Sequence, residues 1–171
     1  MPGKSGCRPL PGKRSDGSSG RFRSSRRRSR RSRPNFSPVS QRLETIPGVG
    51  FVTATAIAAS VADPSAFRSA RQFAAWLGLV PRQNSSGGKE RLGGITKMGD
   101  KSIRNLLVLG ATGTVRYART KGTALATWIT KLVERKPARL ATGALANKIA
   151  RIAWAVMARG EDYRPTAPTA A

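Results

Sequence analysis

The sequence has no histidine and a single cysteine, Cys7, among its 171 residues. Without histidine, a Ser/His/Asp triad, a Cys/His pair and a histidine-ligated metal site are all excluded. One cysteine cannot form an intrachain disulfide or a cysteine-based zinc cluster. No apolar run approaches the roughly 20 residues that a membrane-spanning helix needs. These absences predict a cytoplasmic protein with no membrane partner.

Acidic residues are also scarce, since eight Asp and Glu oppose 32 Lys and Arg and leave a formal charge of +24. A surplus of this size indicates a polyanionic partner, with DNA or RNA ahead of an anionic membrane surface. Residues 1–42 hold thirteen basic residues, and residues 43–171 hold nineteen. A two-metal nuclease site needs three or four converging carboxylates, so we expect no metal site in this chain.

Residues 1–40 are mostly Ser, Arg, Gly and Pro, and we expect them to be a disordered leader. The Arg-rich stretch over 21–33 has two interpretations. It is either an electrostatic arm that binds nucleic acid, or the translation of GC-rich DNA in a wrong reading frame. Residues 164–171 are rich in Thr, Ala and Pro, and we expect a disordered tail there as well.

The periodicity of the apolar residues predicts an all-α domain over residues 41–163, with a helix-hairpin-helix, a glycine-rich loop and a small helical bundle. The expected helices cover residues 41–46, 51–61, 70–77, 101–120, 123–134 and 139–159. Residues 80–100 are rich in glycine and predict a long loop with room for a short hairpin.

Two side-chain patterns predict how these helices pack. Ser69 can cap the helix over 70–77, which would bury Phe73 and Trp76. Trp154 falls opposite the apolar stripe of the last helix, so we expect it to pack against a second element.

The run Ile46-Pro47-Gly48-Val49-Gly50 between two expected helices has the spacing of a helix-hairpin-helix motif. In that motif the backbone N–H groups of the turn, here Gly48, Val49 and Gly50, bind a phosphate without reading base sequence. Both glycines can adopt positive φ in the turn. The alternative is that this run is only a connection between two helices.

Ser85 and Ser86 in the glycine-rich loop are the candidate nucleophiles. Without histidine, a serine hydroxyl needs another source of activation, and dense positive charge could neutralise a phosphorane-like transition state. The nearby cations that could do so are Lys89, Arg91, Lys97, Lys101 and Arg104. The alternative is that both serines are simply solvated. We expect Arg104 on the polar side of its helix, and Lys148 and Arg151 on one side of the last helix, to face DNA.

Several stretches are similar to the C-terminal domain of insertion-sequence transposases of the IS110, IS116 and IS902 family. They are residues 46–50, 67–83, 86–89, 93–100, 104–107 and 146–154. By position in the family motif, the resemblance implies that Ser86 is the nucleophile that attacks DNA, with Ser85 as the fallback.

The resemblance implies further partners and a cofactor. Such transposases carry an N-terminal resolvase-like domain with four acidic metal ligands, so Mg²⁺ is expected in that domain and no cofactor in this chain. A structured guide RNA selects the target, and a homo-oligomer forms the synaptic complex. The implied location is the nucleoid of a bacterial cytoplasm.

This sequence departs from the family pattern because the Arg/Ser leader stands where the resolvase-like domain would be. A truncated or frameshifted element would produce this arrangement. We therefore expect a DNA-binding remnant that keeps Ser86 but does not complete recombination alone. Two other classes stay open: a non-catalytic, sequence-independent nucleic-acid-binding protein, and a basic RNA- or ribosome-associated protein.

Overall fold

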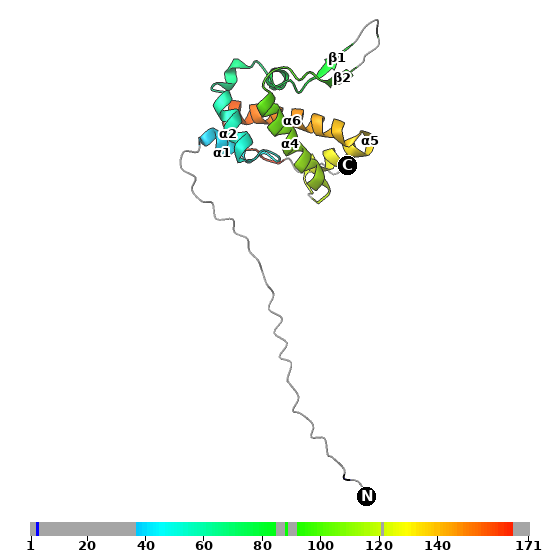
Figure 1. Cartoon of the computed structure of the whole chain (residues 1–171). Helices are drawn as coiled ribbons and strands as arrows, with labels where there is room; N and C mark the ends of the chain where they lie inside the picture. The colour runs from blue at the N-terminus through cyan, green and yellow to red at the C-terminus, as the bar shows by residue number, and fades with distance from the viewer. Residues whose placement is uncertain (1–2, 4–36, 85–87, 89–91, 121, 166–171) are drawn as a thin grey trace. The chain divides into compact units, whose positions relative to one another are not determined.

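A computed structural model describes residues 3, 37–84, 88, 92–120 and 122–165 of the chain (Figure 1). The predicted leader over 1–40 and the end of the predicted tail therefore lie almost entirely outside the described residues. In chain order the elements are α1 (Pro38–Leu43), α2 (Phe51–Ser60), the 3₁₀ turn η1 (Pro64–Ala66), α3 (Ala70–Trp76), β1 (Pro81–Gln83), β2 (Leu92–Ile95), α4 (Lys101–Tyr117), the 3₁₀ turn η2 (Ala118–Thr120), α5 (Ala124–Arg135) and α6 (Ala138–Arg159).

The predicted all-α class is confirmed, with one small sheet in the glycine-rich region. β1 and β2 pair antiparallel, with Pro81 opposite Ile95 and Gln83 opposite Leu92, and the register shifts between these pairs. Most residues of both strands are exposed, and the strands mainly contact each other. In Figure 1 this hairpin stands apart from the helices. The connection between β1 and β2 contains both candidate serines.

Helix α6 is the centre of the core. It packs against α4, α3, α1 and α5, and Figure 1 shows it passing beside α4. Its buried side chains include several alanines among larger groups, which lets neighbouring helices approach closely. These residues are Ala141, Leu145, Ala146, Ile149, Ala150, Ala153 and Val156.

Side-chain caps explain where several helices begin. The Ser69 hydroxyl accepts a hydrogen bond from the Gln72 N–H at 3.3 Å, which confirms the predicted cap of α3. The Gln72 amide oxygen in turn accepts from the Arg68 N–H at 2.7 Å. Asp100 caps α4 by accepting from the Ile103 N–H at 3.0 Å. Each cap satisfies a backbone donor that the helix itself leaves unpaired.

The first helix lies earlier than predicted. α1 begins at Pro38, after the Ser37 cap, and ends at Leu43, whereas the sequence pattern predicted a helix over 41–46. The reason is local, because a Ser cap followed by proline is a strong helix start. Pro47 therefore falls within the turn and does not terminate a helix.

The predictions for Trp76 and Trp154 have different outcomes. Trp154 packs against a second element as predicted, since its Nε1–H donates to the Pro64 carbonyl in η1 at 3.1 Å. The prediction that Trp76 is buried is wrong, because its side chain is 39% exposed. Trp76 covers the outer side of an aromatic cluster, with its ring 5.4 Å from Phe67 and 5.9 Å from Phe73.

Candidate nucleic-acid interface

The turn between α1 and α2 packs directly on α4. Gly48 has φ +90°, as predicted, but Gly50 has φ −96°, so the prediction of a positive φ there is wrong. A Cβ at Gly110 of α4 would collide with the Gly48 carbonyl oxygen. A Cβ at Gly48 would lie 2.6 Å from the Thr114 hydroxyl oxygen. The glycines at 48 and 110 therefore allow this close contact between turn and helix.

This packing limits which turn groups can face a phosphate. The Val49 side chain is buried, and its N–H donates to the Ile46 carbonyl at 3.0 Å. That donor is therefore already used within the turn, contrary to the expectation that it meets a phosphate. Gly50 is exposed at the start of α2.

An apolar groove of about 510 Å³ lies beside the turn. The turn, α4, α5 and the segment around Tyr163 form it, and none of its described lining residues is Lys or Arg. A groove without cations offers little attraction to a polyanion. Gly50 is exposed but also lines this groove, so the phosphate-binding interpretation of the turn stays a prediction.

The two ends of the glycine-rich region are held together by backbone contacts. Gly78 has φ +69° and Gly99 has φ +81°. A Cβ at Gly78 would collide with the Met98 backbone, and a Cβ at Gly99 would collide with the Trp76 carbonyl oxygen. Neither position accepts a side chain, so these glycines allow the end of α3 to pack against the segment that enters α4.

The end of α3 and the segment that enters α4 form a junction at the base of the hairpin, and the buried Arg104 side chain bonds to both. It is 7% exposed, and its Nη1 donates to the Leu77 carbonyl at 3.1 Å and to the Met98 carbonyl at 3.0 Å. The prediction that Arg104 lies on an exposed polar face is therefore wrong. The helical pattern did not reveal that the end of α3 covers this side of α4. A guanidinium that binds carbonyls at a helix C-terminus also meets the negative end of the helix dipole.

The other predicted loop cations have different positions. Lys97 and Lys101 are exposed, and the Lys97 N–H donates to the Gly78 carbonyl at 3.2 Å. Both lysines therefore flank the junction at the base of the hairpin. The predicted residues Ser85, Ser86, Lys89 and Arg91 lie outside the described residues.

Lys148 and Arg151 lie on α6, as predicted. The Lys148 ammonium sits 4.1 Å from the centroid of the Trp128 ring, a cation–π contact. Partial burial lowers the pKa of Lys148, and the positive charge of Arg151 lowers it further. Positive charge is therefore crowded on this part of α6.

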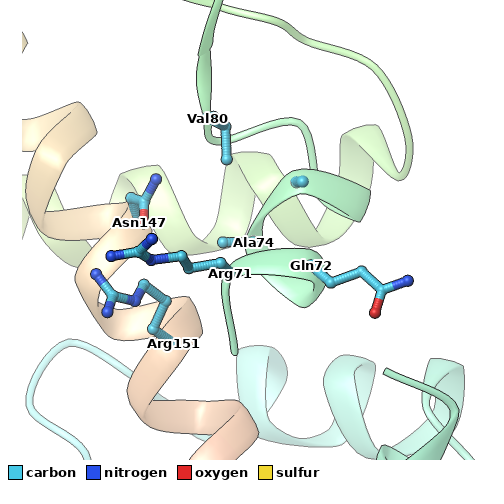
Figure 2. A pocket seen from close by; sticks show the side chains of 7 residues that line it. Arg71, Gln72, Ala74, Val80, Asn147 and Arg151 are labelled. Atoms are coloured by element: carbon cyan, nitrogen blue, oxygen red, sulfur yellow. The ribbon is translucent and has the colours of Figure 1, made fainter. Parts of the chain in front are cut away.

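Arg71 on α3 joins this cluster, although the sequence analysis did not select it. Arg71 and Arg151 line a depression of about 460 Å³ between α3 and α6. Figure 2 shows both side chains at this depression, beside Asn147. One feature of the sequence sets Arg71 apart: it is a cation in the first turn of an expected helix. The helix dipole disfavours a cation there, so such a residue suggests a role other than helix stability.

The described residues do not fit a metal centre. No three His, Cys, Asp or Glu among them are grouped so as to hold an ion. Asp63 is held by Ser65, whose hydroxyl and backbone N–H donate to the carboxylate and lower the pKa of Asp63. In the described part of the chain, no helix has the length and apolarity to cross a membrane.

Comparison with known proteins agrees with this basic, helical domain. Residues 40–126 match the family described as Transposase IS116/IS110/IS902. A probable family 20 transposase of Pseudomonas aeruginosa is 51% identical over 125 residues, which cover 73% of this chain and 37% of that protein. The transposase for insertion sequence element IS1111A of Coxiella burnetii is 47% identical over 124 residues, 72% of this chain and 34% of that protein.

A more distant relative has a different name. The pilin gene-inverting protein of Moraxella bovis is 33% identical over 79 residues, which cover 46% of this chain and 24% of that protein. The two transposases named above are about three times as long as the matched region, so this chain spans about a third of their length. The family match covers more than half of the chain, and the chain belongs to the IS116/IS110/IS902 family of transposases.

Proposed function

We propose that this chain binds DNA and supplies the attacking serine in the transposition of an insertion sequence. The family match over residues 40–126 carries this proposal, because it contains both the glycine-rich region and the packed turn. The relatives' names refer to transposition and to gene inversion, and both processes rearrange DNA. The basic surplus over residues 43–171 supports the same partner.

The proposed chemistry is attack by the Ser86 hydroxyl on a backbone phosphate. A bond forms between the serine oxygen and phosphorus, and one P–O bond of the DNA strand breaks. The proton of the hydroxyl ends on the departing sugar oxygen, so the strand is cut and one end stays bound to the protein. Ser85 is the fallback nucleophile. Mg²⁺ would be held by the resolvase-like domain of the family, and no step is assigned here to a metal bound by this chain.

Residues at the base of the hairpin would position the segment that carries the proposed nucleophile. Arg104 joins the Leu77 and Met98 carbonyls, and so fixes the segments that lead into and out of the hairpin. Lys97 and Lys101 are exposed at the same base, and their positive charge would attract the DNA backbone toward the hairpin. Lys89 and Arg91 would add charge within the loop.

The other partners follow from the family. A homo-oligomer is expected because transposition brings DNA ends together in one complex, and a guide RNA would choose the target. The phosphate-binding role of the helix-hairpin-helix turn, now centred on Gly50, and association with the nucleoid belong to the same proposal.

A second candidate is a nucleic-acid-binding protein without catalysis. The basic cluster of Arg71, Lys148 and Arg151 favours it, because this surface needs neither candidate serine. Under that alternative, DNA binding falls steeply with salt and no strand is cut.

A strand-transfer assay separates the two candidates. The full-length Pseudomonas relative, carrying alanine at the position aligned with Ser86, would be mixed with this chain on a donor and target DNA. The chain is expected to restore strand transfer, and Ser86→Ala is expected to abolish that restoration. Ser85→Ala tests the fallback nucleophile and is expected to restore transfer, whereas its failure beside an active Ser86→Ala would move the assignment to Ser85. Equal restoration by the wild-type chain and Ser86→Ala would contradict the assignment of the nucleophile.

A further inference from the structure

The depression between α3 and α6 gathers positive charge from two helices. Arg71 and Arg151 line it from different helices, and both are exposed. Neither Asp nor Glu occurs among its described lining residues. Two like charges held in one depression repel each other, so the arrangement is more stable when an anion occupies the space between them.

The remaining lining residues suit a small anion. The Asn147 Nδ2 donates to the Leu79 carbonyl at 3.1 Å, which fixes the amide at the edge of the depression. Ala74, Ala75 and Val80 supply an apolar floor. An apolar floor reduces competition from water, and each guanidinium can present two parallel N–H donors to phosphate oxygens.

Lys148 adds a third positive charge close to Arg151. Lys148 follows Asn147 on α6, and both partial burial and the Arg151 charge lower its pKa. The Trp128 ring contacts the Lys148 ammonium but does not neutralise it. The site therefore combines two direct anion ligands with a nearby charge that draws anions toward it.

We propose that Arg71 and Arg151 bind one backbone phosphate of duplex DNA in this depression. This inference rests on the proposed function, which makes DNA the partner, and it adds a contact that lies on α3 and α6 and not at the helix-hairpin-helix turn. Contact through phosphate alone would position the chain on DNA without reading base sequence.

A pair of matched double variants tests the contact in the full chain. Arg71→Gln with Arg151→Gln removes the two proposed ligands. Arg116→Gln with Arg135→Gln removes two charges from other exposed helix positions and is the control. Binding to a fluorescent 30-base-pair duplex would be measured across a series of salt concentrations. Thermal unfolding of each variant would confirm that it is folded.

The expected result is specific to the first pair. The affinity of the Arg71→Gln, Arg151→Gln variant for DNA at low salt should fall by about tenfold or more. The slope of log K against log salt should become shallower by about 0.9, the value for one neutralised phosphate. The control pair should change the slope by less than half as much. Equal effects of the two pairs, with tight binding by the wild-type chain, would overturn this inference and leave the proposed function standing. No DNA binding by the wild-type chain would overturn both.

A photo-crosslink gives a second readout that the basic leader cannot produce. Benzoylphenylalanine would replace Ala75, an exposed residue that lines the depression, and in a control chain it would replace Thr127 on α5. Crosslinking of duplex DNA at position 75 but not at 127 is expected. Crosslinking of RNA but not DNA at position 75, or equal yields at both positions, would overturn the inference.

Discussion

Arg104 lies in α4, yet its Nη1 donates to the carbonyl oxygen of Leu77, 27 residues earlier in the chain, at 3.1 Å. The same nitrogen donates to the Met98 carbonyl at 3.0 Å. One buried guanidinium thus joins the end of α3 to the segment that enters α4. Since the hairpin with the candidate serines leaves and re-enters the fold here, Arg104 is a positioning residue for that hairpin.

Arg104→Met is expected to destabilise the fold. Methionine keeps much of the side-chain volume but leaves the Leu77 and Met98 carbonyls without this donor. Hydrogen bonds from a charged group contribute about 1.5–3 kcal/mol each, so the free energy of unfolding should fall by about 2 kcal/mol or more. Urea unfolding measures this change. Arg116→Met, on the exposed side of the same helix, should change it by less than about 0.5 kcal/mol. Equal effects of the two variants would contradict a buried role for Arg104.

Gly110→Ala is expected to separate the turn from α4. Its Cβ would collide with the Gly48 carbonyl, and a strained insertion into a packed site costs about 1–3 kcal/mol. Gly113→Ala is a control in the same helix, because nothing lies within 4 Å of its added Cβ. That control should stabilise the protein by up to about 1 kcal/mol, since alanine favours the helix over glycine. Thermal unfolding of both variants would show opposite shifts of Tm, and shifts of the same sign would contradict the packing.

Gly99→Ala is expected to disturb the base of the hairpin. Position 99 has φ +81°, and a Cβ there would meet the Trp76 carbonyl. Gly94→Ala is the control, because its Cβ meets nothing within 4 Å. The alanine at 99 should cost about 1–3 kcal/mol of stability, and the alanine at 94 much less. Amide hydrogen exchange over residues 77–80 checks the location, and unchanged protection there in Gly99→Ala would contradict the predicted contact.

The lowered pKa of Lys148 should make the free energy of unfolding depend on pH. Its pKa in the folded chain lies below the ordinary value of 10.5, so the unfolded chain holds more protons between these two values. The contribution of Lys148 to stability therefore rises with pH through that window. Lys148→Met should flatten the rise, because methionine keeps contact with Trp128 but does not titrate. Urea unfolding between about pH 8 and 11 measures this, and parallel profiles of the two proteins would contradict the lowered pKa.

Much of the fold follows from local signals in the sequence. Ser69, Asp100 and Thr123 each precede an apolar periodic run, and each caps the helix that follows. The glycine-rich stretch predicted a loop with a short hairpin because glycine and proline break helices, and β1 and β2 form there. These features depend on neighbouring residues, so the order of elements could be read from the chain.

Features that depend on tertiary contacts were not predictable in this way. Arg104 looked exposed because helical periodicity alone does not show that the end of α3 covers it. Trp76 looked buried because a large apolar side chain is usually buried, yet Phe67 and Phe73 already fill the space beneath it. Arg71 was missed because its partner Arg151 lies 80 residues away, and only the packing of α3 on α6 brings the two together.

The central claim is that this chain acts on DNA, and its binding to a duplex tests that claim most directly. The affinity of the full chain for a 30-base-pair DNA would be measured from 50 to 300 mM salt, beside a structured RNA of equal charge. We expect duplex binding that weakens linearly in log K against log salt, with a slope that reports several neutralised phosphates. Equal affinity for any structured RNA, with none for duplex DNA, would contradict the claim and favour an RNA-associated protein.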